Sequence, residues 1–118
     1  MRGKNAVITG GARGIGEAIA TVMAKMGANI IIWDVLEEQA KATADKLAKE
    51  HGVKTAGTGV DVTKGDSVDA AVEAAVKEFG SIDILVNNAG ITRDGLIIRM
   101  KEEDWDMVLA INLKGVWQ

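Results

Sequence analysis

The chain has 118 residues, of which 47% are hydrophobic and 26% are charged, and its formal net charge is −3. This length corresponds to one domain, and an acidic balance without a basic run argues against nucleic acid as a partner. With no cysteine and one histidine, disulfides, thiolate catalysis and Cys- or His-based metal sites are excluded, and we predict no metal. No apolar run approaches the roughly 20 residues that span a bilayer, and no signal peptide is recognisable, so we expect a cytoplasmic protein that does not enter membranes.

Short β-branched runs alternate with amphipathic stretches along the chain. The apolar runs predict strands at residues 6–9, 29–34, 55–62 and 82–87. Periodic apolar residues predict helices at 14–26, at 36–50, after residue 63 up to Gly80, and from about 101 to the last residue. Strands that alternate with helices through short loops predict an α/β fold with a parallel sheet. There is no internal repeat or linker, so residues 1–118 are predicted to form a single unit.

Each predicted helix has an apolar face that we expect to be buried. In chain order these faces are Ile15, Ile19, Val22, Met23 and Met26; Leu36, Ala40, Ala44 and Leu47; Val68, Val72, Ala75, Val76 and Phe79; and Trp105, Val108, Leu109, Leu113 and Val116. Thr63 with Asp66 three residues later predicts a capping box at the start of the third helix. Trp33 is expected to be a packing residue, and His51, at a helix end, is not expected to form a site.

Glycines gather between the first strand and the first helix. Gly10, Gly14 and Gly16 have the spacing at which one glycine makes a tight turn, the second admits a pyrophosphate, and the third lets helix and strand pack closely. The N–H groups of the helix N-terminus then face the phosphates. Glycines that merely make turns are the alternative, but three at these offsets in this context favour a dinucleotide site.

Asp34 ends the second predicted strand, 18 residues beyond Gly16. An acid at this position accepts hydrogen bonds from the adenosine ribose, and its charge repels a 2′-phosphate, which favours NAD(H) over NADP(H). Arg13 supports the alternative cofactor, NADP(H), because a guanidinium beside the turn can hold a 2′-phosphate. A helix N-cap or a loop acid is the other interpretation of Asp34.

Taken together, the motifs resemble the N-terminal pattern of the short-chain dehydrogenase/reductase family. They are Thr9-Gly-x-x-x-Gly-x-Gly16, Asp61-Val62, Asn87-Asn88-Ala89-Gly90 and Asn112. The stretch from Asp83 to Asn112 is most similar to the 3-oxoacyl-[acyl-carrier-protein] reductases. The resemblance covers essentially the whole chain. It implies a Rossmann-type parallel sheet with strand order 3-2-1-4 and helices on both faces, truncated after the fourth strand and its following helix: a dinucleotide-binding half-domain.

The resemblance also implies a role for each motif. Asp61 would bond the adenine amino group beside the backbone of Val62, and Asn88 and Gly90 would line the ribose and nicotinamide. Asn112 matches the catalytic asparagine of the family, which holds a water in a proton relay. The implied cofactor-binding residues are Gly10, Ala12, Arg13, Gly14, Ile15, Gly16, Asp34, Val35, Asp61, Val62, Asn88, Ala89 and Gly90.

The remaining catalytic residues of the family are a serine, a tyrosine and a lysine downstream of the position of Asn112. The chain has no tyrosine, and its two serines, Ser67 and Ser81, lie away from the expected nicotinamide. Because a positioned general acid or base contributes about 10²–10⁴-fold, we expect these 118 residues to be catalytically incomplete. Two interpretations stay open. One is the cofactor-binding half of an NAD(P)-dependent carbonyl reductase, and the other is a self-associating binding or structural module without turnover.

Truncation also predicts association. The strand at 83–87 would become an open edge, and the last helix would keep an exposed apolar stripe. We therefore expect a homodimer or higher homo-oligomer, or a missing C-terminal half, as the partner of these surfaces. Helix packing is favoured over strand pairing, because it repeats the subunit contact of the family.

Overall fold

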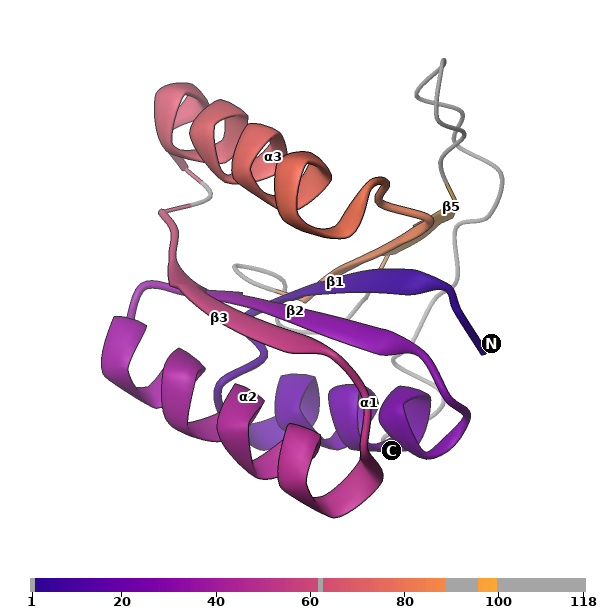
Figure 1. Cartoon of the computed structure of the whole chain (residues 1–118). Helices are drawn as coiled ribbons and strands as arrows, with labels where there is room; N and C mark the ends of the chain where they lie inside the picture. Colours follow the sequence, from indigo (N-terminus) through magenta and orange to yellow (C-terminus); the bar gives the residue numbers. More distant parts are fainter. Residues whose placement is uncertain (1, 62, 89–95, 100–118) are drawn as a thin grey trace.

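The computed structural model describes residues 2–61, 63–88 and 96–99 (Figure 1). Its sheet has the strand order β3-β2-β1-β4-β5, and the first four strands in this list are parallel. This confirms the predicted order 3-2-1-4. In chain order the elements are β1 (Asn5–Thr9), α1 (Gly14–Lys25), β2 (Asn29–Asp34), α2 (Glu37–His51), β3 (Thr55–Gly59), α3 (Gly65–Phe79), β4 (Ile84–Asn87) and β5 (Leu96–Arg99).

Helices cover both faces of the sheet, with α1 and α2 on one face and α3 on the other (Figure 1). Alternate residues of the central strands therefore enter different cores. Ala6 and Ile8 of β1 pack with α1 and α2, whereas Val7 of the same strand packs with α3. In β2, Trp33 is only 3% exposed and belongs to the core that packs against α3. This confirms the prediction that Trp33 is a packing residue. Strands buried on both faces explain why these runs are apolar throughout.

The buried face of α1 differs from the prediction. Met23 is buried, but Ile15, Val22 and Met26 are 42%, 56% and 53% exposed. The helix instead turns its smallest residues towards the sheet, and these are Gly16, Ala20 and Ala24. Small side chains allow the helix axis to approach the strands closely, so the large apolar residues are displaced to the flank and the outer surface.

The second and third helices follow their predicted faces in part. In α2, Ala40, Ala44 and Leu47 are buried, while Leu36 precedes the helix and is 36% exposed. In α3, Ala71 and Ala75 are buried, and Val76, predicted to be inside, is 40% exposed. Gly80 ends α3 with a positive φ of 92°, as its predicted role at the helix end requires.

The predicted capping box at the start of α3 is wrong. Lys64 is the N-cap residue of α3 and makes no side-chain capping bond. Thr63 donates instead to the carboxylate of Asp61, both from its backbone N–H, at 3.0 Å, and from its hydroxyl, at 2.6 Å. The nearer acid is thus the preferred partner of Thr63, and β3 ends earlier than predicted, at Gly59.

The sheet contains one strand that the sequence analysis did not predict. β5 pairs antiparallel with β4, from Ile84 opposite Arg99 to Asn87 opposite Leu96. The prediction that residues 83–87 form an open edge is therefore wrong, because β5 occupies that side of β4. The predicted helix from about residue 101 lies outside the described residues.

Within the part of the chain that the structure describes, none of the helices is long and apolar enough to cross a bilayer.

Candidate functional site

The predicted site residues lie just after the carboxyl ends of the strands, and these ends form one edge of the sheet, which we call the carboxyl edge. In the register of the sheet, Thr9 of β1 lies between Trp33 of β2 and Asn87 of β4, and Asp34 pairs with Gly59 of β3. Because the strands are parallel, the segments that follow them leave the sheet on the same side. This edge brings together the glycine turn, the end of β2, the segment after β3 and the end of β4, which is where open α/β sheets bind ligands.

The glycine turn follows β1 and opens α1. Gly10 and Gly14 both have a φ of 63°, in the left-handed region that favours glycine. A Cβ on Gly16 would overlap the carbonyl oxygen of Gly10, so only glycine lets the first turn of α1 lie against the loop. A Cβ on Gly14 would meet no atom within 4 Å, which leaves open space above the turn. This close turn with one open side fits the approach of a pyrophosphate.

The other predicted residues of the turn divide into a buried and an exposed group. Ala12 is 4% exposed and belongs to the core between the sheet and the first two helices. Arg13, the N-cap residue of α1, and Ile15 in its first turn are exposed. Ala12 therefore contributes its backbone, while Arg13 and Ile15 present side chains at the edge.

Asp34 is hydrogen-bonded to two loops at once. Its Oδ2 accepts the N–H of Ala12 at 3.2 Å, and its Oδ1 accepts the N–H of Leu36 at 3.1 Å. An ionised carboxylate has about four acceptor positions, so two remain for other donors such as ribose hydroxyls. The neighbouring Val35 is 68% exposed. Asp34 is not an N-cap, since Leu36 precedes α2 in that position.

Asp61 lies after β3 in a compact polar turn. Its backbone N–H donates to the Ser67 hydroxyl at 3.1 Å, and its carboxylate accepts the two bonds from Thr63. The pKa of the Asp61 carboxyl is held below its ordinary value of 3.8. The largest cause is the hydrogen bond from the Thr63 hydroxyl, followed by the bond from the Thr63 backbone N–H, and the charge of Lys64 contributes less. Ser67, to which the sequence analysis gave no role in the site, thus holds this turn.

Replacing Thr63 with valine is expected to raise the pKa of Asp61 towards its ordinary value, because the largest cause of the lowering is removed. A carboxyl whose folded pKa is lowered stabilises the fold at pH values above its unfolded pKa, and this contribution is lost as the pH falls through the folded pKa. NMR titration of the Asp61 carboxyl in the two proteins measures the change. An identical titration in Thr63→Val would contradict the assigned cause.

At the end of β4, the N–H of Asn88 donates to the Thr9 hydroxyl at 2.8 Å. The same hydroxyl donates to the carbonyl oxygen of Val86 at 3.4 Å. Thr9 therefore joins the end of β4 to the start of the glycine turn and holds Asn88 at the edge. The predicted site residues Val62, Ala89, Gly90 and Asn112 lie outside the described residues.

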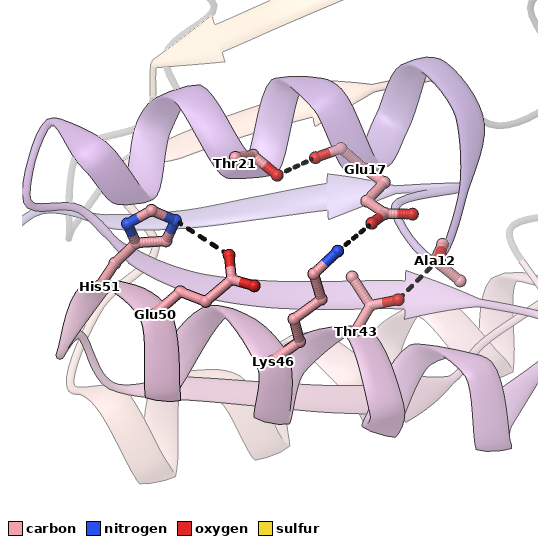
Figure 2. A network of polar contacts seen from close by, with 7 residues as sticks. All are labelled: Ala12, Glu17, Thr21, Thr43, Lys46, Glu50 and His51. Carbon is pink, nitrogen blue, oxygen red and sulfur yellow. Dashed lines mark hydrogen bonds and ion pairs between the residues drawn. The ribbon is translucent and has the colours of Figure 1, made fainter.

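Thr43 of α2 is a residue that sequence reasoning missed. Its side chain reaches from the helix to the glycine turn and donates to the carbonyl oxygen of Ala12 at 2.7 Å (Figure 2). Thr43 is 8% exposed. The sequence does indicate that Thr43 is unusual. It lies three residues after Ala40 and one before Ala44, so it is a polar residue on the apolar face of the helix.

An ion pair between α1 and α2 is a weaker contact than the hydrogen bond from Thr43 to the glycine turn. Lys46 and Glu17 are 3.4 Å apart, but their side chains are 57% and 31% exposed (Figure 2). Such surface pairs contribute about 0–1 kcal/mol. At the other end of α2, His51 lies 3.8 Å from Glu50. Among the described residues, no group of three or more histidine, aspartate or glutamate side chains is arranged to hold a metal ion.

Comparison with curated proteins finds 3-oxoacyl-[acyl-carrier-protein] reductases. The chain is 47% identical to the enzyme of Chlamydia muridarum over 114 residues, which are 97% of this chain and 46% of the relative. It is also 47% identical to the enzyme of Thermotoga maritima over 120 residues, covering 99% of this chain and 47% of the relative. The chain thus spans about half the length of the curated relatives that it matches.

Solved structures show the same fold. L-sorbose reductase from Gluconobacter frateurii, complexed with NADPH and L-sorbose, matches with a TM-score of 0.73 and 42% identity over 79% of this chain and 36% of that protein. NAD⁺-bound xylitol dehydrogenase matches with a TM-score of 0.72 and 33% identity, covering 79% and 35% of the two chains. The family model described as short chain dehydrogenase matches residues 4–118. The chain therefore belongs to the short chain dehydrogenase family.

Proposed function

We propose that this chain binds NAD(H) at the carboxyl edge of its sheet, as the cofactor-binding half of a carbonyl reductase similar to the 3-oxoacyl-[acyl-carrier-protein] reductases. The observation that carries the proposal is the joint arrangement of the glycine turn and Asp34, linked by the hydrogen bond from the Ala12 N–H. The turn fits a dinucleotide because it is close-packed at Gly16 and open at Gly14. Family members with bound NADPH and with bound NAD⁺ support a nicotinamide cofactor of either type.

Each residue at the edge has a distinct task under this proposal. The amides at the start of α1 hold the pyrophosphate, where the helix dipole favours negative charge. Asp34 accepts the ribose hydroxyls, and the exposed Val35 beside it contacts the adenine. Asp61 and Val62 bind the adenine edge, while Asn88, Ala89 and Gly90 line the nicotinamide side. A bound nicotinamide supplies a hydride to a carbonyl carbon.

Proton transfer needs groups beyond these. Of the family's catalytic set we assign only Asn112 in this chain, and the 118 residues contain no tyrosine. We therefore propose that these residues alone bind cofactor without useful turnover. The alternative function, a self-associating module that keeps the fold, rests on the apolar pattern of residues 105–116, which favours a homodimer or higher oligomer through that predicted helix. Its second support, an open β4 edge, is removed by β5.

The cofactor preference is tested by isothermal titration calorimetry with NADH and NADPH. We expect NADH to bind about ten- to a hundredfold more tightly, because a hydrogen bond to a charged group contributes about 1.5–3 kcal/mol. ADP-ribose and its 2′-phosphorylated form serve as controls that isolate the phosphate, and they should show the same ratio. Equal affinities, or a preference for NADPH, would remove the argument from Asp34 and favour Arg13 as the selective residue.

A further inference from the structure

We propose that Thr43 is a positioning residue for the cofactor, which fixes the orientation of the glycine turn from α2. This inference rests on the proposed NAD(H) site and adds to it a residue that does not itself touch the ligand. Its basis is the hydrogen bond between the Thr43 hydroxyl and the carbonyl oxygen of Ala12, which joins two segments 31 residues apart (Figure 2).

The backbone of Ala12 is held on both sides. Its N–H is bound by the Asp34 carboxylate at 3.2 Å, and its carbonyl oxygen is bound by the Thr43 hydroxyl at 2.7 Å. The two peptide groups that flank Ala12 are therefore fixed by side chains from different elements, β2 and α2. Few conformations of the turn satisfy both bonds, so the pair orders the loop before a ligand arrives.

The Thr43 bond also sets the direction of the next amide. There are no cis peptide bonds among the described residues, so the N–H of Arg13 points opposite to the carbonyl of Ala12. Because that carbonyl faces Thr43 on α2, the Arg13 N–H is directed away from α2. This orientation leaves it for an acceptor on the far side of the turn, as a pyrophosphate lying across the start of α1 would be.

The helix that carries Thr43 is firmly placed on the sheet. Thr55 of β3 donates from its hydroxyl to the carbonyl oxygen of Ala44 at 2.8 Å. Gly57 of the same strand lies against Ala40, so closely that a Cβ on Gly57 would overlap the Ala40 carbonyl. These contacts flank Thr43 on α2 and make the helix a rigid support for the turn.

The test compares two threonine-to-valine substitutions, each of which removes a hydroxyl that donates to a backbone carbonyl oxygen. Thr43→Val removes the bond to the turn, and Thr55→Val removes a bond of nearly the same length that stays between α2 and β3. Calorimetry with NADH is expected to show about tenfold weaker binding for Thr43→Val, since an unpaired buried carbonyl loosens the turn. Thr55→Val and Thr43→Ser should stay within about twofold of the wild type, although the two valine variants lose similar thermal stability.

Adenosine, which carries the base and ribose without phosphate, is the second probe. Its affinity, followed by NMR, should be equal in the wild type and Thr43→Val. Equal loss of adenosine and NADH binding, or unchanged NADH binding in Thr43→Val, would overturn the inference while leaving the proposed function intact. A wild type that binds no NADH would overturn the proposed function and this inference together. If Thr43→Val does not fold, Thr43→Ala replaces it in the same comparison.

Discussion

Replacing Gly16 with alanine is expected to abolish measurable NAD(H) binding and to lower the free energy of unfolding by about 1–3 kcal/mol. The new methyl group would occupy the position of the Gly10 carbonyl oxygen, and two further backbone atoms of Gly10 and Gly11 lie within 2.9 Å of it. Backbone cannot rotate out of the way as a side chain can. The start of α1 must therefore move away from the turn, and the amides that we propose to bind the pyrophosphate move with it.

Two other glycines provide matched controls for this prediction. Gly65 begins α3, a Cβ there would meet no atom, and its φ is not positive, so Gly65→Ala should be neutral or stabilising by up to about 1 kcal/mol. Gly14→Ala introduces no overlap but places alanine at a φ of 63°, which costs about 1–2 kcal/mol. Chemical denaturation and calorimetry with NADH measure both effects. A Gly16→Ala protein that binds NADH like Gly65→Ala would refute the close-packing argument.

The sheet could be predicted because its strands carry an unambiguous pattern. A run such as Ile30 to Trp33 is apolar at every position, and this occurs when helices cover both faces of a parallel strand. The alternation with helices indicates a parallel sheet, and the order of the strands was predicted from the resemblance to the family. β5 was not predicted, because four residues from Leu96 to Arg99 are too short a run to distinguish a strand from part of a helix.

The buried faces of helices were harder to predict from the sequence. Hydrophobic periodicity selects the largest apolar residues, and in α1 it selected Val22 and Met26, which are exposed. Ala20 and Ala24 lie in the contact with the sheet, and their small side chains allow the helix to approach the strands closely. Which side chains fit between a helix and a sheet depends on the distance between the two elements. This distance cannot be predicted from the sequence of the helix alone.

The candidate site was predicted where it follows the sheet and missed where it depends on tertiary contacts. Asp34 and the glycines were located by their distance from a strand end. The hydroxyl of Thr43, by contrast, finds its acceptor on Ala12, in another element. The capping box was wrongly predicted because Thr63 has an acid on each side, Asp61 and Asp66, and it bonds to the nearer one. Competition between local partners is decided by backbone geometry that the sequence alone does not specify.

Replacing Asp34 is expected to remove the proposed preference for NAD(H). A carboxylate and a phosphate about 4 Å apart repel by about 1 kcal/mol per unit charge in water and about 4 kcal/mol at the effective dielectric near a protein surface. Asp34→Asn removes this charge at nearly constant size, so NADPH should bind at least about tenfold more tightly than it does to the wild type. The ratio of the two affinities should fall to near one.

Besides the proposed charge effect, the structure gives Asp34 a second role. Asp34 also holds the N–H groups of Ala12 and Leu36, and Asp34→Ala leaves both without that acceptor. We therefore expect Asp34→Ala to lose the preference as Asp34→Asn does, and in addition to bind both cofactors more weakly, because the turn loses its anchor. Asparagine keeps one acceptor oxygen and should retain part of that affinity.

Calorimetry with NADH and NADPH at low and high salt distinguishes the two roles. The part of the preference that comes from charge repulsion shrinks as salt screens it, whereas the loss of affinity from a loosened turn does not. Arg13→Gln is the control, since Arg13 is exposed at the N-cap of α1 and lies on the same edge. If both Asp34 variants kept the wild-type ratio while Arg13→Gln changed it, selectivity would reside in the guanidinium, and Asp34 would serve the glycine turn alone.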